Sequence, residues 1–425
     1  MSKRKYKSVR LHSLDLGKIE ERAAGARLAV GIDLAKEELY AAVMTPALEV
    51  LQIIRWRQPK ELQDFVEVAK LLAEVAEEVA FVMEPSGVYG DPLRQALCDA
   101  GLTVRRVSPK RSHDAAEVYD GVPSLHDAKC AAIIAKLHFD GASEDWGLRT
   151  DHERRLAASL RVMEVFEKEF RRNRNRLEGL LFRFWPELGE ILKLGSATML
   201  ELLVSYGGPR AVAEAPDEAR QLMRQVGGGF LDPAKVEAVI ASASATVGMR
   251  QLDDECVLVS VVAQEARRNQ QMSRRARKRV EELTADDDAT KVMREVVGKT
   301  SAAVLVAAVG SPVRYDSAYA YLKSLGLNLK EISSGKRKKG QLHITRRGPG
   351  IARLFLYLAA LRLIKSDPVV RAWYAKKVAR QGGQAKNKAV IAVVRKLAKA
   401  LWHIARDQAP FDSSRLFDVQ RLKVA

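Results

Sequence analysis

The stretch LAVGIDLAKEELYAAVM, residues 28–44, decides the fold of the first part of the chain. Two apolar runs are separated by a short charged turn, so the pattern predicts a β-strand that reaches Asp33 and turns into a second strand ending at Met44. An isolated Asp in this place ordinarily ends a strand and caps a turn. A second acid, in a similar place further along the chain, favours a functional role for Asp33.

The rest of the first 150 residues alternates between strand and helix patterns. After the hairpin, the apolar spacing and the glycines predict a helix at 60–79, a strand at 79–83, a helix at 92–100 and a strand at 102–107. This order implies an α/β layer with a mostly parallel portion, in which ligands gather at the carboxyl ends of the strands. Asp33 and Glu84 both lie at such ends.

A third acid, Asp127, lies at the start of an Ala- and Ile-rich stretch. Residues 129–138 predict a helix, with Ser124 as a candidate N-cap. Asp127 would then lie in the first turn, where the helix dipole by itself accounts for an anion. If Asp33, Glu84 and Asp127 converge, their oxygens could hold two Mg²⁺ or Mn²⁺ ions that align a phosphodiester displacement, because hard oxygen ligands select these ions over zinc.

The segments GIDLAKEE, MEPSGVYGDPL and LHDAKCAA occur in this order, with 51 residues from Asp33 to Glu84 and 43 from Glu84 to Asp127. They resemble the DEDD motif of the one-ten family of insertion-sequence transposases. The resemblance implies a RuvC-like, ribonuclease-H-like domain with these three acids as metal ligands. The family usually ends its motif with two aspartates three residues apart, whereas here the residue three before Asp127 is Ser124 and the residue three after it is Cys130, so one carboxylate is missing from the expected place. Asp120 could substitute as the fourth ligand, or three acids could suffice.

Charge indicates the kind of partner. The chain carries a net charge of +18, and residues 336–406 alone hold 19 Lys or Arg against one acid, Asp367. This surplus indicates a polyanionic partner, most commonly nucleic acid, although a ribosomal or membrane-surface protein could share it. No apolar run is long enough to span a membrane. Three scattered cysteines give neither a disulfide framework nor a zinc pattern, so we expect a reducing, cytoplasmic compartment. The family resemblance described above adds the expectation of a bacterial, nucleoid-associated protein.

The middle of the chain is helical in pattern. Residues 151–181 and 257–284 are long amphipathic stretches, each with a dense run of arginines, and solvated basic helices would look the same. Together they predict an antiparallel coiled arm around a tip that looks rich in loops near Gly227–Phe230. The family resemblance implies that this insertion mediates subunit association, as a dimer and as a tetramer in the synaptic complex.

The last third predicts a small, mainly helical domain. Residues 291–310 read as helix, glycine turn and helix, which resembles a helix-hairpin-helix grip on phosphates, although a plain helical hairpin would show the same Gly298. Residues 351–364 and 386–406 predict core helices. Between these elements lies a basic segment around Ser334 that would ordinarily be a flexible loop.

The family resemblance gives that basic segment a catalytic role. It implies that Ser334, or else the neighbouring Ser333, is a nucleophile that forms a covalent protein–DNA intermediate. Such a serine needs a base or metal to remove its proton and cations to hold the phosphate charge. The candidates for nucleic-acid contact are all basic: Lys336, Arg337, Lys338, Lys339, Arg346, Arg347 and Arg353.

We therefore expect an α/β plus all-α protein with three parts: a RuvC-like metal-binding domain at 1–150, a helical coiled-coil insertion at 151–290 and a serine transposase domain at 291–425. The expected function is DNA transposition and recombination, and the resemblance adds an element-encoded bridge RNA as a structured guide. One alternative is a metal-dependent nuclease or Holliday-junction resolvase that uses water. Another is a nucleic-acid-binding protein without catalysis.

Overall fold

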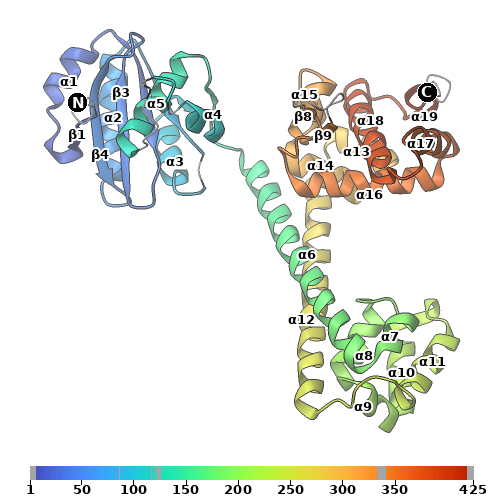
Figure 1. Ribbon diagram of the computed structural model, residues 1–425. Coiled ribbons are helices and arrows are strands. Elements are labelled where there is room, and N and C mark those ends of the chain that lie inside the picture. The colour runs from blue at the N-terminus through green and yellow to red at the C-terminus, as the bar shows by residue number, and fades with distance from the viewer. Residues whose placement is uncertain are drawn as a thin grey trace. The chain divides into compact units, whose positions relative to one another are not determined.

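The computed structural model describes residues 6–85, 87–115, 117–119, 121, 126–332 and 341–418 (Figure 1). The chain divides into two compact units, Met1–Thr150 and Asp151–Ala425. Among the described helices, none combines the length and apolar character needed to cross a bilayer.

A mixed sheet forms the centre of the first unit, and its described strands run in the order β1-β4-β3-β2-β5-β6-β7. The strands are β1 (Ser8–Arg10), β2 (Arg27–Asp33), β3 (Glu38–Met44), β4 (Val50–Arg57), β5 (Glu78–Met83), β6 (Val104–Arg106) and β7 (Glu144–Asp145). The predicted hairpin is confirmed, because β2 and β3 pair antiparallel with Asp33 opposite Tyr40. The parallel portion is confirmed as well, since β2 pairs with β5 and β5 with β6 in parallel. The sequence analysis missed β4, which extends the hairpin to a third antiparallel strand.

The two faces of this sheet bury different side chains. The helices of the unit are α1 (Leu16–Ala23), α2 (Leu62–Val75), α3 (Asp91–Asp99), α4 (Pro109–Asp114) and α5 (Asp127–Phe139). Val30 and Ile32 of β2 pack in one core with apolar side chains of α1, α2 and α3. Ala29 packs in a second core with the alanines of α5. Because side chains alternate along a strand, residues 29, 31 and 33 share the face that α5 covers.

Gly31 brings β2 and α5 close together. A Cβ atom at residue 31 would lie 2.2 Å from the carbonyl oxygen of Ala131 and 2.3 Å from the amide nitrogen of Ala135. A real Cβ atom cannot approach backbone atoms so closely, so the packing of α5 on the sheet depends on glycine here. Asp33, two residues further along the same face, is thereby directed toward the first turn of α5.

Two long antiparallel helices form the arm of the second unit, namely α6 (Asp151–Phe184) and α12 (Asp253–Leu283), as predicted (Figure 1). Glu167 of α6 accepts hydrogen bonds from Ser273 Oγ and Arg277 Nη2 of α12, each at 2.7 Å, and these contacts fix the register of the two helices. The α12 side of the seam consists of small or β-branched apolar side chains and two buried polar ones: Val259, Ala263, Ala266, Asn269, Ser273, Ala276 and Val280.

The tip of the arm is not rich in loops, so that prediction was wrong. It is a helical lobe with α7 (Pro186–Ile191), α8 (Ala197–Tyr206), α9 (Pro209–Glu214), α10 (Pro216–Gly227) and α11 (Pro233–Ser244). These helices bury a core together with the adjoining ends of α6 and α12. The glycines that suggested a loop form a single 3-10 turn, Gly228–Phe230, between two helices. The cluster of glycines suggested a long loop, but it forms only a short turn between two helices of 12 residues each.

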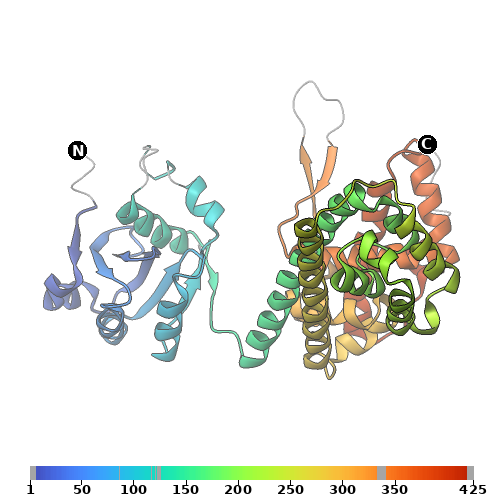
Figure 2. The ribbon, with the colours of Figure 1, turned by 90° about the horizontal axis from the view of Figure 1, so that it is seen from below.

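The C-terminal part of the second unit is mainly helical, as predicted. Its helices are α13 (Asp288–Val297), α14 (Lys299–Val309), α15 (Ala318–Ser324), α16 (Gly350–Ser366), α17 (Pro368–Arg380), α18 (Lys386–Asp407) and α19 (Ser413–Leu416). These helices share one hydrophobic core, to which α18 contributes the apolar side chains of its buried face. The sequence analysis missed an antiparallel hairpin, β8 (Leu329–Ile332) and β9 (Gln341–Ile344), which Figure 2 shows as paired arrows.

Candidate functional site

The three predicted acids come together in the first unit. Asp33 is the last residue of β2, Glu84 follows the last residue of β5, and Asp127 is the first residue of α5. Because β2 and β5 are parallel neighbours, their carboxyl ends meet at one edge of the sheet. Helix α5 covers the face of β2 that carries Asp33, so its first turn faces the same edge. Local chain geometry therefore explains the convergence.

The electrostatic surroundings of Asp33 include both of the other acids. Burial raises the pKa of Asp33 most strongly, and the negative charges of Asp127 and then Glu84 raise it further, to about 6 from an ordinary value of 3.8. The backbone N–H of Leu34 donates a hydrogen bond that lowers this pKa and only partly offsets the rise. A carboxyl group in such surroundings takes up or releases a proton near neutral pH, as catalytic groups often do.

Cys130 is a fourth member of this group. It lies one helical turn after Asp127 on α5, and burial raises the pKa of its thiol to about 11, with further contributions from Asp33, Asp127 and Glu84. The thiol therefore stays protonated at neutral pH. Lys129 lowers the pKa of the Cys130 thiol and partly offsets this rise. Because Lys129 is only 2% exposed, its amino group is a buried cation near the acids. We refer to Asp33, Glu84, Asp127 and Cys130 as the acid cluster.

Sequence reasoning noted Cys130 only as a missing carboxylate. The available signal was the spacing of three residues from Asp127, which places two side chains on the same face of a helix. Sequence reasoning did not single out Lys129 at all, because nothing in a helical pattern of small residues marks a lysine as buried.

One cap prediction was wrong. The N-cap of α5 is His126, whose Nδ1 accepts a hydrogen bond from the backbone N–H of Lys129 at 3.3 Å. Ser124, the predicted cap, lies outside the described residues, as does the alternative fourth acid Asp120. The helix therefore begins at Asp127, which confirms the prediction that this acid lies in the first turn.

No metal site is evident from the geometry alone. Within the described parts of the chain, no three Asp, Glu, His or Cys side chains form a group that could hold a metal ion. The metal roles of Asp33, Glu84 and Asp127 thus remain predictions. Their support is the charge coupling at Asp33 and the oxygen-rich donor set.

The predicted nucleophile falls between two described strands. Ser333, Ser334 and the basic residues Lys336, Arg337, Lys338 and Lys339 lie outside the described residues. The hairpin β8–β9 brackets them, with Ile332 paired to Gln341 in the ladder. Both ends of the serine segment are therefore fixed next to each other by backbone hydrogen bonds.

Two glycines fix the chain just beyond this hairpin. A Cβ atom at Gly348 would lie 2.4 Å from the carbonyl oxygen of Ser324, and one at Gly326 would lie 2.8 Å from backbone atoms of Arg347. The chain after β9 therefore crosses the end of α15 at backbone contact distance. This crossing gives a physical reason for glycine in the TRRGPG segment.

The three described basic candidates differ in their surroundings. Arg346 and Arg347 are exposed. Arg353 is partly buried, and its Nη1 donates hydrogen bonds to the carbonyl oxygens of Gly348 at 2.7 Å and Leu325 at 3.2 Å. Burial, and the nearby charge of Arg346, lower the pKa of Arg353 from its ordinary value. Arg353 therefore secures the backbone crossing, whereas the other two arginines can reach a phosphate.

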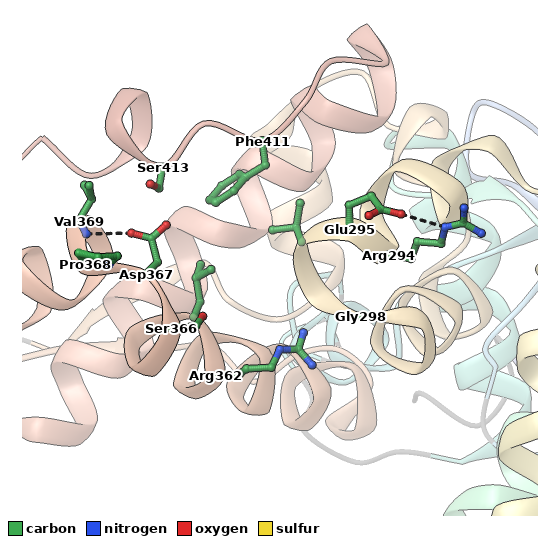
Figure 3. A pocket seen from close by; sticks show the side chains of 12 residues that line it. Arg294, Glu295, Gly298, Arg362, Ser366, Asp367, Pro368, Val369, Phe411 and Ser413 are labelled. Atoms are coloured by element: carbon green, nitrogen blue, oxygen red, sulfur yellow. Dashed lines mark hydrogen bonds and ion pairs between the residues drawn. The ribbon is translucent and has the colours of Figure 1, made fainter.

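The predicted helix, glycine turn and helix is present as α13, Gly298 and α14. Gly298 has a φ of 79° and leaves α14 without a side-chain cap. A guanidinium nitrogen of Arg362 lies 3.0 Å from the place of a Cβ atom on Gly298. A pocket of about 620 Å³ opens here, and Figure 3 shows Arg362 of α16, Asp367 of the following turn and Arg294 of α13 among the residues that line it. Asp367 caps α17 through the N–H groups of Val369 and Val370. Phosphate binding at this turn stays a prediction.

The fold and the acid cluster define a class before any comparison with known proteins. A mixed α/β sheet with carboxylates at adjacent strand ends and at the start of a covering helix is consistent with a ribonuclease-H-like DEDD domain. Enzymes of this class work on phosphodiesters with divalent metal ions.

Comparison with known families agrees with this class. A family model described as a transposase of the DEDD and IS110 type matches residues 30–186, which include the whole acid cluster. A second, described as Transposase IS116/IS110/IS902 family, matches residues 295–375, which include the hairpin β8–β9. No curated protein matches the chain.

Together, the two matches support an IS110-family transposase. The chain is therefore an enzyme, a DNA transposase or recombinase, and the non-catalytic alternative is set aside.

Proposed function

We propose that this enzyme cleaves and exchanges the DNA strands of an insertion sequence through two sets of residues. The first is the acid cluster, in which Asp33, Glu84 and Asp127 would hold Mg²⁺ or Mn²⁺. The observation that supports this proposal is the position of Asp33 and Glu84 at the ends of adjacent parallel strands and of Asp127 at the start of the helix that covers them, where the charges of Asp127 and Glu84 raise the pKa of Asp33. When bound, a divalent cation would offset this shared negative charge and hold the phosphate oxygens in line for displacement.

The protonation of Asp33 suits a role in proton transfer. With a pKa of about 6, the carboxylate form predominates at neutral pH, yet the group is far more basic than an ordinary Asp. A carboxylate of this kind can accept the proton of an attacking hydroxyl group. The thiol of Cys130 stays neutral beside it and adds no fourth charge.

The second set is the serine segment. In the proposed reaction, the Oγ atom of Ser334, or of Ser333, attacks phosphorus and gives up its proton to a carboxylate. A phosphoserine ester forms, the bond from phosphorus to the leaving deoxyribose oxygen breaks, and that oxygen takes a proton to leave as a hydroxyl group. The hydroxyl group of another DNA strand then attacks the phosphoserine, which joins the strands and restores the serine. Arg346 and Arg347, with Lys336, Arg337, Lys338 and Lys339, would hold the charge of the phosphate.

The remaining parts of the proposal follow the family resemblance. The three predicted domains, at 1–150, 151–290 and 291–425, would act in a homo-oligomer in which the acid cluster of one subunit serves the serine segment of another. An element-encoded structured RNA would direct the choice of DNA, and the large basic surplus after residue 336 is compatible with binding it.

A direct test asks for the covalent intermediate. The full-length protein is incubated with Mg²⁺, the ends of its element and the RNA transcribed from them, and a protein–DNA adduct is sought on denaturing gels. We expect an adduct that Ser334→Ala abolishes and Ser333→Ala retains. Asp33→Asn should lower its yield strongly, whereas the control Asp91→Asn, which changes another first-turn aspartate on α3, should not.

The other outcomes are informative. Loss of the adduct only in Ser333→Ala would identify Ser333, rather than Ser334, as the nucleophile. An adduct that survives both serine substitutions refutes the serine assignment. Cleavage that survives both, but disappears in Asp33→Asn, favours the alternative in which the acid cluster works as a hydrolytic nuclease or junction resolvase.

A further inference from the structure

One strongly charged surface lies outside both proposed sites. Between Arg267 and Arg279, helix α12 carries seven Arg or Lys residues and no acid. The buried seam with α6 occupies the opposite side of the helix. Successive residues turn by about 100°, so the side chains on the outer side form a stripe along the helix axis. We call this stripe the α12 basic face: Gln264, Arg268, Gln271, Arg275, Lys278 and Arg279.

Every residue of the α12 basic face is exposed. The stripe extends over about 22 Å at about 1.5 Å per residue. It contains amide and cationic side chains and no apolar one. A protein interface of this length would ordinarily include apolar or aromatic anchors, whereas duplex nucleic acid presents a phosphate charge about every 1.7 Å along its axis.

The positive charges of this face are only weakly neutralised. Arg275 has no ion-pair partner among the described residues. Arg268 faces Glu265 at 3.7 Å, and Lys278 and Arg279 share the single carboxylate of Glu282 at 4.0 and 3.3 Å. Exposed ion pairs of this kind contribute little to stability, so phosphate groups can replace the glutamate partners with little loss of folding free energy.

By contrast, two of the three arginines that lie off this face pair with other elements of the fold, whereas the third, Arg274, is exposed. Arg277 pairs with Glu167 of α6 at 2.7 Å, and Arg267 pairs with Glu201 of the tip lobe at 2.9 Å. Arg267 and Arg277 therefore pair with other elements of the fold, whereas the ion pairs of the outer cations Arg268, Lys278 and Arg279 stay within α12. Helix stability alone does not require such a cluster, because like charges three and four residues apart repel.

We propose that the α12 basic face binds the sugar–phosphate backbone of duplex DNA, so that the arm is a DNA-binding element in its own right. The proposal rests on the enzyme acting on DNA and does not depend on the metal or serine assignments. The axial phosphate spacing of duplex DNA supplies several charges along a stripe of this length, and preference for structured RNA is the alternative outcome of the test. Gln271 lies between Arg268 and Arg275, Gln264 lies at the start of the stripe, and both amides can donate hydrogen bonds to phosphate or sugar oxygens.

The test removes three of the charges. Full-length Arg268→Gln/Arg275→Gln/Arg279→Gln is compared with the wild type for binding a DNA duplex and an RNA hairpin, each of arbitrary sequence, over a series of salt concentrations. If each cation neutralises one phosphate, the slope of log affinity against log salt falls by about 2.7 for the duplex, and affinity at about 0.1 M salt falls tenfold or more. A loss of binding that affects the RNA hairpin more than the DNA duplex would overturn the assignment to DNA.

The matched control is Lys193→Gln/Arg224→Gln/Lys235→Gln, which removes three exposed charges from the tip lobe. A complementary variant, Gln264→Lys/Gln271→Lys, should tighten binding and steepen the slope. The proposal is refuted if the α12 triple variant and the control lose equal affinity, or if the triple variant changes the oligomeric state and leaves binding unchanged. No residue changed here belongs to the acid cluster or the serine segment. The binding result therefore stays interpretable if the adduct assay fails, and the adduct result stays interpretable if the binding test fails.

Discussion

The pH response of Asp33 gives the sharpest prediction from the structure. In the metal-free protein, the Asp33 carboxyl should titrate near pH 6 because burial and the charges of Asp127 and Glu84 disfavour its ionised form. Replacing Asp127 by Asn keeps the size of the side chain and removes one charge. The pKa of Asp33 should then fall, while remaining above the ordinary 3.8 because burial, the largest cause, persists.

The same shift sets the sign of a stability effect. The folded-state pKa of Asp33 lies above its unfolded value, so the folded protein binds more protons between pH 3.8 and about 6. The contribution of Asp33 to the free energy of unfolding must therefore decrease as pH rises through this window. A shift of about two units corresponds to at most about 3 kcal/mol, and partial exposure to solvent reduces this to roughly 1–2 kcal/mol. Asp127→Asn should make the decrease smaller.

The titration can be followed directly by NMR of full-length protein with ¹³C-labelled aspartate carboxyl groups. The matched control is Asp91→Asn, because Asp91 is also the first residue of a helix but lies exposed beside Arg94. The control should leave the titration of Asp33 unchanged. The proposed convergence of the acids would be refuted if Asp33 of the wild type titrated near pH 3.8, or if its pKa did not change in Asp127→Asn.

Three further predictions concern neighbouring features. Cys130→Asp should place a fourth carboxylate in the acid cluster and raise the pKa of Asp33 further in metal-free protein. It should also increase the rise in melting temperature on adding Mg²⁺, measured by thermal unfolding with and without Mg²⁺. An unchanged response to Mg²⁺ would exclude Cys130 from the site. Gly31→Ala should destabilise the first unit by about 3 kcal/mol or more in chemical unfolding, because its Cβ would meet backbone atoms of α5, while Gly179→Ala on open surface of α6 should stabilise by about 0.5–1 kcal/mol. Glu167→Gln should lower the melting temperature of the arm and weaken its dependence on salt, because the charge that Arg277 pairs with is lost; equal salt dependence would contradict this.

The sequence predicted most of the regular structure where its patterns are strong. The hairpin at 28–44, the two long helices of the arm and the helix, glycine turn and helix near 298 all carry clear periodicity or clear breakers. The acids at strand ends could be expected to converge because parallel neighbouring strands end at one edge of a sheet. Asp127 joined them because α5 covers the face of β2 on which Asp33 lies.

The elements that were missed differ in the strength of their local patterns. Strand β4 is rich in strand-forming Val, Ile and Trp and could have been predicted, whereas hairpin β8–β9 contains as many polar as apolar residues, so tertiary pairing decides it. The helical lobe at the arm tip depends on packing among consecutive short helices and against the ends of α6 and α12, which the helical patterns do not specify. The burial of Lys129 and the role of Arg353 in holding backbone carbonyls follow from packing alone.

The register between α6 and α12 has a consequence for how such a protein can change in length. Because Glu167 meets Ser273 and Arg277 across an antiparallel seam, an insertion in one helix shifts every later contact unless the other helix gains a matching insertion. Only paired additions of about seven residues, two helical turns, would keep the seam buried. The distance between the tip lobe and the C-terminal helices should thus change in steps among related proteins, with both helices lengthened together.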